Sequence, residues 1–177
     1  MGAQMRENAE KKDNIILIGM PGVGKSTVGV VLAKKMGYRF LDSDLIIQEE
    51  TGKLLHEIIS SEGLSGFIKV ENDVNRNIQA HHSVIATGGS VVYGTEAMEH
   101  LKGIGRVVYL KLSCEGIADR LGDLKKRGVA LKEGQTLAEL YAERVPLYEK
   151  YGDLTVDCEE KGLRSVVEEI DKRLRMQ

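Results

Sequence analysis

The chain has 177 residues, a length typical of one compact domain, and its 25 Lys and Arg nearly balance its 27 Asp and Glu. The formal net charge of −2 argues against nucleic acid as the main partner, because a nucleic-acid-binding domain carries a strongly basic face. The longest apolar runs fall far short of the ~20 residues of a membrane span, so no membrane partner is expected. The two cysteines, Cys114 and Cys158, form no CxxC pair, and the expected compartment is a reducing cytoplasm.

Residues 1–13 are polar and lack the apolar core of a secretory signal, so we expect a flexible N-terminal extension. A single domain is predicted over residues 14–177, in which short apolar runs alternate with longer stretches of helical spacing. The predicted strands lie at 14–19, 38–41, 83–86, 106–112 and 154–156. The predicted helices lie at 27–36, in two or three pieces across 45–80, and at 96–102, 113–121, 136–151 and 163–175. This alternation predicts an α/β fold with a largely parallel sheet, whose ligands bind at the carboxyl ends of the strands.

The first strand leads into a glycine-rich loop. Residues 19–26 read G-M-P-G-V-G-K-S, which matches G-x-x-x-x-G-K-[ST] between a strand and a helix. In such a loop the backbone N–H groups converge on phosphate oxygens at the positive end of the helix dipole. Lys25 would reach the β- and γ-phosphates, and the Ser26 hydroxyl is suited to ligate Mg²⁺. The alternative is a glycine-rich turn that binds no ligand. A dinucleotide-binding loop is excluded because Thr27 stands where its pattern requires glycine.

Other sequence features show which class of phosphate-binding protein this loop belongs to. A regulatory GTPase would carry an N-K-x-D guanine-binding motif, and the chain contains none. The chain is also short for an ATPase motor. A small-molecule kinase remains, in which catalysis consists mainly of positioning and charge neutralisation.

Two aspartates end the second predicted strand. Asp42 and Asp44 are alternate residues, so in a strand both carboxylates point to the same face. One could bind Mg²⁺, directly or through water, and the other could accept a proton from a substrate hydroxyl. The alternative is that Asp44 caps the helix that begins at Leu45.

The order of these and later motifs resembles that of the shikimate kinases, a family of the nucleoside-monophosphate-kinase type. The resemblance extends from residue 14 to 157. It rests on the loop at 19–27, Phe40-Leu-Asp-Ser-Asp44, Gly63…Phe67…Glu71, Gly88-Gly89, Arg120 with Arg127, Leu140…Arg144-Val-Pro-Leu-Tyr148, and Asp153. It implies a three-layer P-loop kinase fold, with a five-stranded parallel sheet flanked by helices and a mobile lid at about 122–135. It also implies a monomer that uses ATP and Mg²⁺ to phosphorylate a small hydroxylated acceptor, namely the 3-hydroxyl of shikimate in aromatic amino-acid biosynthesis.

The resemblance also implies a role for individual residues. The expected catalytic residues are Lys25, Asp44 and Arg127, with Arg127 on the lid. The expected ATP-binding residues are Gly19, Gly22, Val23, Gly24, Lys25, Ser26, Thr27, Arg120 and Arg127. Ser26 and Asp42 would hold the metal. Asp44 would meet the reacting hydroxyl, Gly88 and Gly89 would offer backbone N–H groups to the substrate, and Arg144 would pair with its carboxylate.

Three positions depart from the family pattern. Ile68 stands where the family has an arginine that helps to clamp the carboxylate, and Lys69 cannot replace it because one helical step turns a side chain by ~100°. Ser90 replaces the last residue of a triple glycine, and the lid reads R-G-V-A-L at 127–131. Ile68 predicts weakened binding of shikimate, unless Lys69 or another cation moves into the site. The alternatives are a kinase for another polyol or hydroxy acid, and a nucleotide-binding regulatory protein whose acceptor site has decayed.

Overall fold

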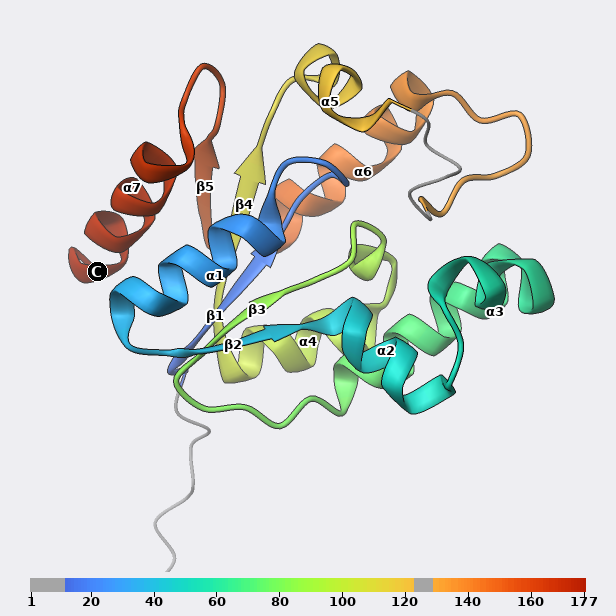
Figure 1. Ribbon diagram of the computed structural model, residues 1–177, viewed down its shortest axis with the longest axis horizontal. Helices are drawn as coiled ribbons and strands as arrows, with labels where there is room; N and C mark the ends of the chain where they lie inside the picture. Colours follow the sequence, from blue (N-terminus) through green and yellow to red (C-terminus); the bar gives the residue numbers. More distant parts are fainter. Residues whose placement is uncertain (1–11, 123–128) are drawn as a thin grey trace, which may run out of the picture.

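The computed structural model describes residues 12–122 and 129–177, and its centre is a sheet of five parallel strands in the order β2-β3-β1-β4-β5 (Figure 1). The strands are β1 (Asn14–Ile18), β2 (Arg39–Asp42), β3 (Ser83–Ala86), β4 (Gly105–Lys111) and β5 (Leu154–Asp157). The helices are α1 (Lys25–Met36), α2 (Ser43–Thr51), α3 (Leu55–Arg76), α4 (Thr95–Ile104), α5 (Cys114–Leu121), α6 (Leu137–Tyr151) and α7 (Leu163–Arg175), and a short 3₁₀ helix η1 spans Val91–Tyr93. The predicted α/β fold class is confirmed.

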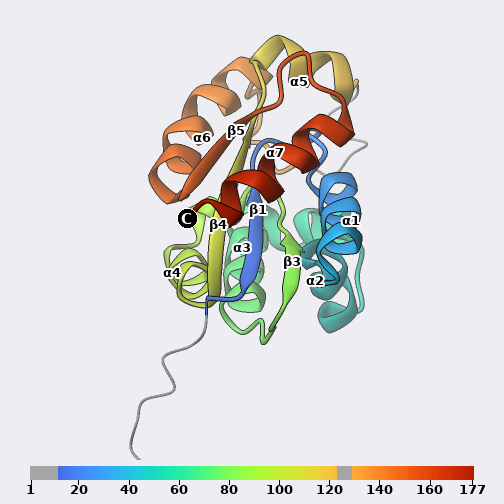
Figure 2. The same ribbon diagram turned by 90° about the vertical axis from the view of Figure 1, so that its left-hand side faces the viewer.

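Helices cover both faces of the sheet. Helices α1 and α7 pack against each other on one face, and α4 and α6 lie on the other (Figures 1 and 2). Helices α2 and α3 extend beyond the carboxyl ends of β2 and β3, and α5 stands beyond the end of β4. The carboxyl edge of the sheet is therefore bordered by helices on two sides, where ligands bind in folds of this kind.

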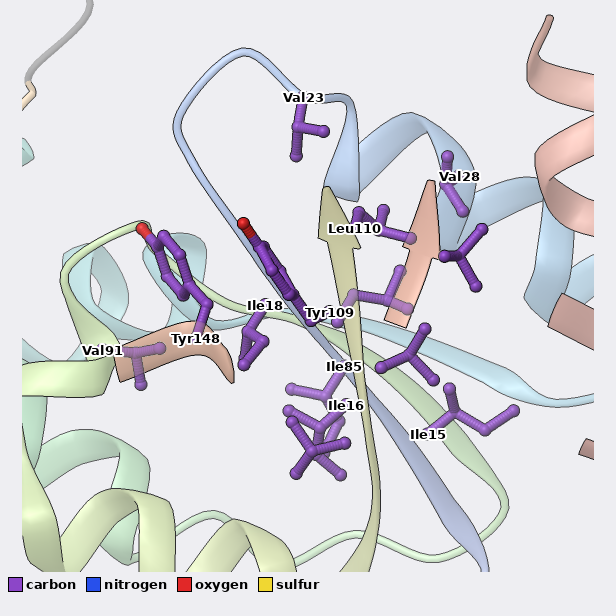
Figure 3. Packing of buried hydrophobic residues seen from close by; sticks show 14 of the residues in the cluster. Ile15, Ile16, Ile18, Val23, Val28, Ile85, Val91, Tyr109, Leu110 and Tyr148 are labelled. Carbon is purple, nitrogen blue, oxygen red and sulfur yellow. The ribbon is translucent and has the colours of Figure 1, made fainter. Parts of the chain in front are cut away.

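The apolar run of β1 is continuous because this central strand is covered on both faces. The side chains from Ile15 to Ile18 are at most 4% exposed (Figure 3). Each such aliphatic side chain contributes about 1.5–3 kcal/mol by its burial. Next to them, the rings of Tyr109 and Tyr148 stack with their centroids 5.2 Å apart, which joins β4 to α6. The core thus holds β1 and α6 in place, and these two elements carry the predicted phosphate loop and Arg144.

Local signals explain most helix bounds. The hydroxyls of Ser113 and Thr136 accept hydrogen bonds from the backbone at the starts of α5 and α6, and both residue types are favoured at such helix starts. One of the breaks expected within residues 45–80 is a kink inside α3, where Gly63 adopts a φ of +72°. At the start of α2 the capping residue is Asp42, whose Oδ1 accepts from the backbone N–H of Asp44 at 3.0 Å. The alternative in which Asp44 caps the helix is therefore excluded, because β2 extends to Asp42 and α2 already begins at Ser43.

Two predicted segments extend beyond the described residues. These are most of the N-terminal extension, and residues 123–128 of the predicted lid together with Arg127. Within the two described ranges, every helix is too short or too polar to span a membrane.

Candidate active site

The glycine-rich loop runs from the end of β1 to the start of α1 at the carboxyl edge of the sheet. Gly24 has a φ of +102° directly before α1, a conformation that glycine adopts without strain. Lys25 is 8% exposed, and its Nζ donates hydrogen bonds to the carbonyls of Gly19 and Met20 at 2.8 and 2.9 Å. Burial lowers the pKa of Lys25 to about 8, although the carboxylate of Asp44 opposes that shift. The loop thus holds one buried cation beside its phosphate-binding backbone.

Ser26 and Asp42 meet at the mouth of the loop. The Ser26 hydroxyl donates to Asp42 Oδ2 at 2.9 Å, which joins the first turn of α1 to the end of β2. Mg²⁺ prefers oxygen ligands, keeps several waters, and is held by one or two protein oxygens together with substrate phosphates. The described residues contain no cluster of three or more His, Cys, Asp and Glu that would make a protein-only metal site. A hydroxyl and a carboxylate beside a phosphate loop are therefore a donor set that fits Mg²⁺.

A cavity of about 420 Å³ opens from this loop toward α2, α3 and α6. Most of the predicted site residues in the described ranges line it. Its lining comprises Pro21, Gly22, Gly24, Lys25, Ser26, Thr27, Asp44, Leu55, Phe67, Glu71, Thr87, Gly88, Gly89, Ser90, Leu121, Val129, Ala130 and Arg144. The phosphate loop and the predicted acceptor residues therefore share one cavity, although Asp44 and Arg144 are 100 positions apart in the chain.

Arg120 and Val23 belong to the border of the loop. Arg120 Nη1 donates to the carbonyl of Val23 at 2.9 Å, and it lies 4.0 Å from the point where a Cβ on Gly24 would stand. This exposed arginine therefore lies against the phosphate loop on the side of α5. Gly19 closes β1, and its carbonyl holds Lys25.

Asp44 lies at the floor of the cavity, opposite the loop. A Cβ built on Gly88 would stand 2.8 Å from Asp44 Oδ1, so only a residue without a side chain leaves this approach open. Burial and the neighbouring Asp42 raise the pKa of Asp44 to about 6, and Lys25 opposes the shift. A carboxyl group with such a pKa is matched to accepting a proton from a hydroxyl near neutral pH.

Arg144 forms the far wall. It is 1% exposed, its Nη2 donates to the carbonyl of Ala130 at 2.9 Å, and its guanidinium lies 5.4 Å from the ring centre of Tyr93. A Cβ on Gly89 would stand 2.9 Å from Nη1. Among the described residues no carboxylate lies within the 4.0 Å of an ion pair with this guanidinium, so its charge is available to an anion in the cavity.

Comparison with known proteins agrees with this geometry. A protein-family model described as shikimate kinase matches residues 21–175, which is most of the chain. The chain belongs to the shikimate kinase family. It is 39% identical to the shikimate kinase of Thiobacillus denitrificans over 83% of this chain and 82% of the relative, and 37% identical to that of Vibrio vulnificus over 94% and 98%. The crystal structure of the shikimate kinase from Acinetobacter baumannii in complex with shikimate superposes with a TM-score of 0.86 at 34% identity, covering 94% of this chain and 95% of that one. The predictions of the family, its P-loop fold and a kinase activity are confirmed.

One cavity residue of this shikimate kinase family member had no role in the sequence analysis. Glu71 is 1% exposed in the middle of α3, and its Oε2 accepts from the Ser90 hydroxyl at 2.5 Å. Burial raises the pKa of Glu71 to about 7, while the Ser90 hydrogen bond opposes the shift. Its spacing of four from Phe67 places it on the buried face of α3, and that spacing is the signal that could have found it.

Ile68 lies outside the main cavity. It is half-buried and lines two smaller hollows, one of which shares Ala130 with the main cavity. The other walls of that shared hollow include Tyr93, Lys132 and Glu143. Position 68 therefore lies behind the wall of the main cavity near Arg144. A longer side chain at this position could extend into the cavity, whereas isoleucine does not.

Proposed function

We propose that the protein transfers the γ-phosphoryl group of ATP to the 3-hydroxyl of shikimate. The observation that supports this most strongly is the single cavity, with a phosphate loop at one end and a carboxyl group beside a buried, unbalanced guanidinium at the other. The loop suits a nucleoside triphosphate, and the other end suits a small molecule with one hydroxyl and one anionic group. The family and the shikimate-bound relative support the choice of acceptor.

On this proposal the phosphate loop binds and orients the nucleotide. Its backbone N–H groups and Lys25 would neutralise the phosphate oxygens on which charge develops during transfer. Ser26 and Asp42 would hold Mg²⁺, which supplies further charge neutralisation when it is bound. Arg120, which already contacts the loop, would meet the nucleotide from the side of α5, and Arg127 would do so from the lid.

Asp44 acts at the acceptor. Its carboxylate would accept the hydrogen bond of the reacting hydroxyl and take its proton as the oxygen bonds to phosphorus. Arg144 would pair with the acceptor's carboxylate and the backbone N–H groups of Gly88 and Gly89 would orient it, so that the hydroxyl faces the phosphate loop. Fixing both reactants in one cavity removes a large entropic part of the barrier.

The proposal is tested by measuring ADP formation with shikimate, quinate, gluconate and other polyols, each against an assay without acceptor. Shikimate should give the largest acceptor-dependent rate, and mass spectrometry should find one added phosphoryl group on it. The variant Asp44→Asn keeps the shape of the site and controls for simple ATP hydrolysis, because its acceptor-dependent rate should be lost. Nucleotide binding without any acceptor-dependent rate would instead indicate a regulatory protein.

Two further expectations, a monomer and a cytoplasmic location, stay predictions. Light scattering of the purified chain tests the first, and cell fractionation tests the second.

A further inference from the structure

Glu71 is a buried carboxyl group without a cation partner. Its Oε2 is bonded to Ser90, while its Oε1 is buried and has no hydrogen-bond partner among the described residues. Oε1 lies 2.5 Å from the point where a Cβ on Gly88 would stand, and Asp44 Oδ1 lies 2.8 Å from the same point. Two carboxyl groups thus converge on the floor of the acceptor end.

The charged and titratable groups around Glu71 come from several elements. Asp44 on α2 is a like charge, while Lys25 on α1 and Arg144 on α6 are cations that face it at longer range, and Tyr148 on α6 also faces it. Both cations are held elsewhere, Lys25 by loop carbonyls and Arg144 by Ala130. No ion pair of Glu71 occurs within the described ranges.

Position 68 explains this isolation. Residues 68 and 71 are three apart on α3 and so are neighbours on the helix surface. An arginine at 68 could give a guanidinium to Glu71, whereas Ile68 cannot. Ser90 supplies one neutral hydrogen bond to Glu71 instead, at a position where glycine would supply none.

The isolation has a consequence for an anionic acceptor. An acceptor carboxylate at Arg144 would enter the same low-dielectric cavity as Glu71 and Asp44. A third negative charge there is unfavourable unless one carboxyl group is neutral. Glu71 carries no reacting role, so neutralising it leaves Asp44 free to act.

We infer that Glu71 takes up a proton when an acceptor carboxylate binds at Arg144, and that it thereby makes acceptor binding depend on pH in this chain. This inference rests on the proposed function, because it requires an anionic acceptor. Ser90 is a positioning residue, which holds Oε2 and limits how readily the proton is bound.

The pKa of Glu71 determines the direction in which acceptor binding changes with pH. Its pKa, about 7 in the free protein, would rise further when an anion binds. Acceptor binding is therefore strongest below that pKa and weakens as the pH rises through it. A carboxylic acid such as shikimate has an ordinary pKa far below this range, so the acceptor itself does not titrate here.

The test measures shikimate binding by titration calorimetry across this pH range, with Glu71→Gln as the informative variant and Glu99→Gln, on the exposed face of α4, as its control. The Kd of the unaltered protein should rise roughly tenfold between pH 6.5 and 8.5. The Kd of Glu71→Gln should change little over the same pH range. Lys25 and Asp44 are present in both proteins, so the ratio of their Kd values isolates Glu71. In buffers of different ionisation enthalpy, the unaltered protein and Glu99→Gln should show proton uptake on binding, and Glu71→Gln should not.

A second variant keeps the inference testable if Glu71→Gln does not fold. Ser90→Ala removes the hydrogen bond that favours ionised Glu71, so it should shift the pH of half-maximal binding upward and tighten binding at high pH. A merely structural role of Ser90 would weaken binding at every pH.

Identical pH profiles and equal proton uptake for the unaltered protein and Glu71→Gln would overturn the inference, and so would uniformly weaker binding by Ser90→Ala. Failure of the proposed function looks different: the unaltered protein would then neither bind nor phosphorylate shikimate at any pH.

Discussion

The two ends of the cavity are built in different ways. The nucleotide end is contiguous, since residues 19–27 supply the loop, Lys25 and the Ser26 hydroxyl between β1 and α1. The acceptor end is assembled from α2, α3, the turn after β3, and α6, which contribute Asp44, Glu71, Gly88 to Ser90, and Arg144. A contiguous site is constrained by its own backbone. An assembled site can lose one side chain and adjust through its neighbours in space.

Position 68 illustrates this difference. The nucleotide end follows its motif at every position. At the acceptor end, this chain has Ile68 where the family resemblance implies an arginine, and Ser90 donates a hydrogen bond to the neighbouring carboxyl group of Glu71. The four predictions below separate the two ends by asking which KM, and which step, each variant changes.

Lys25→Ala should have the largest effect. We expect kcat to fall on the order of 10³-fold or more, because a cation aimed at the transferred phosphoryl group is lost. The fold should persist, since the strands and the core do not depend on Nζ. Steady-state kinetics and circular dichroism measure both, with exposed Lys34→Ala on the same helix as control. Near-normal turnover in Lys25→Ala would remove the mechanism proposed for the nucleotide end.

Arg144→Ala should act on the acceptor alone. Loss of one charged hydrogen-bonding partner costs on the order of 1.5–3 kcal/mol, so KM for shikimate should rise roughly ten- to a hundredfold. KM for ATP should stay unchanged, because Arg144 lies at the other end of the cavity. Initial-rate measurements with each substrate varied test this, with exposed Arg164→Ala as control. Equal rises in both KM values would show that the two ends are not separable.

Ile68→Arg should lower KM for shikimate, which is a smaller change than that of Arg144→Ala and in the opposite direction. If shikimate is the acceptor, the added guanidinium should lower its KM by up to about tenfold with little change in kcat, as for uniform binding. It should also pair with Glu71 and flatten the pH dependence of binding. Ile68→Met controls for side-chain size without charge. If the native acceptor lacks a carboxylate, Ile68→Arg would instead impair the native reaction, because it adds an unpaired charge beside the cavity.

Tyr148→Phe should have the smallest effect. Its hydroxyl donates to the carbonyl of Gly89 at 2.6 Å and so helps to orient the backbone that faces the acceptor. Removing one such bond should lower the free energy of unfolding by about 1 kcal/mol and raise KM for shikimate a few-fold. Urea unfolding and kinetics measure the two effects, with Tyr151→Phe on the same helix as control. An unchanged KM for shikimate would limit Tyr148 to a packing role.

The sequence by itself determined the parts that depend on neighbours along the chain. The strands follow from short apolar runs, the starts of α5 and α6 from Ser113 and Thr136, and the phosphate loop from eight adjacent residues, because each signal acts over one or two turns of backbone. The resemblance of later motifs added the family, and it suggested the acceptor roles that we propose for Asp44 and Arg144.

Only the tertiary structure decided which residues meet across the cavity. The sequence left two roles open for Asp44, and the structure decides between them, because Asp42 caps α2 and Asp44 faces the cavity. It gave Glu71 no role and counted Ser90 only as a departure from the family pattern, although the two side chains form a buried pair between α3 and the turn after β3. These outcomes depend on distances between segments far apart in the chain, and no local pattern of residues encodes such distances. The physical reason is that a charge acquires its partners, and its pKa, from the packing around it.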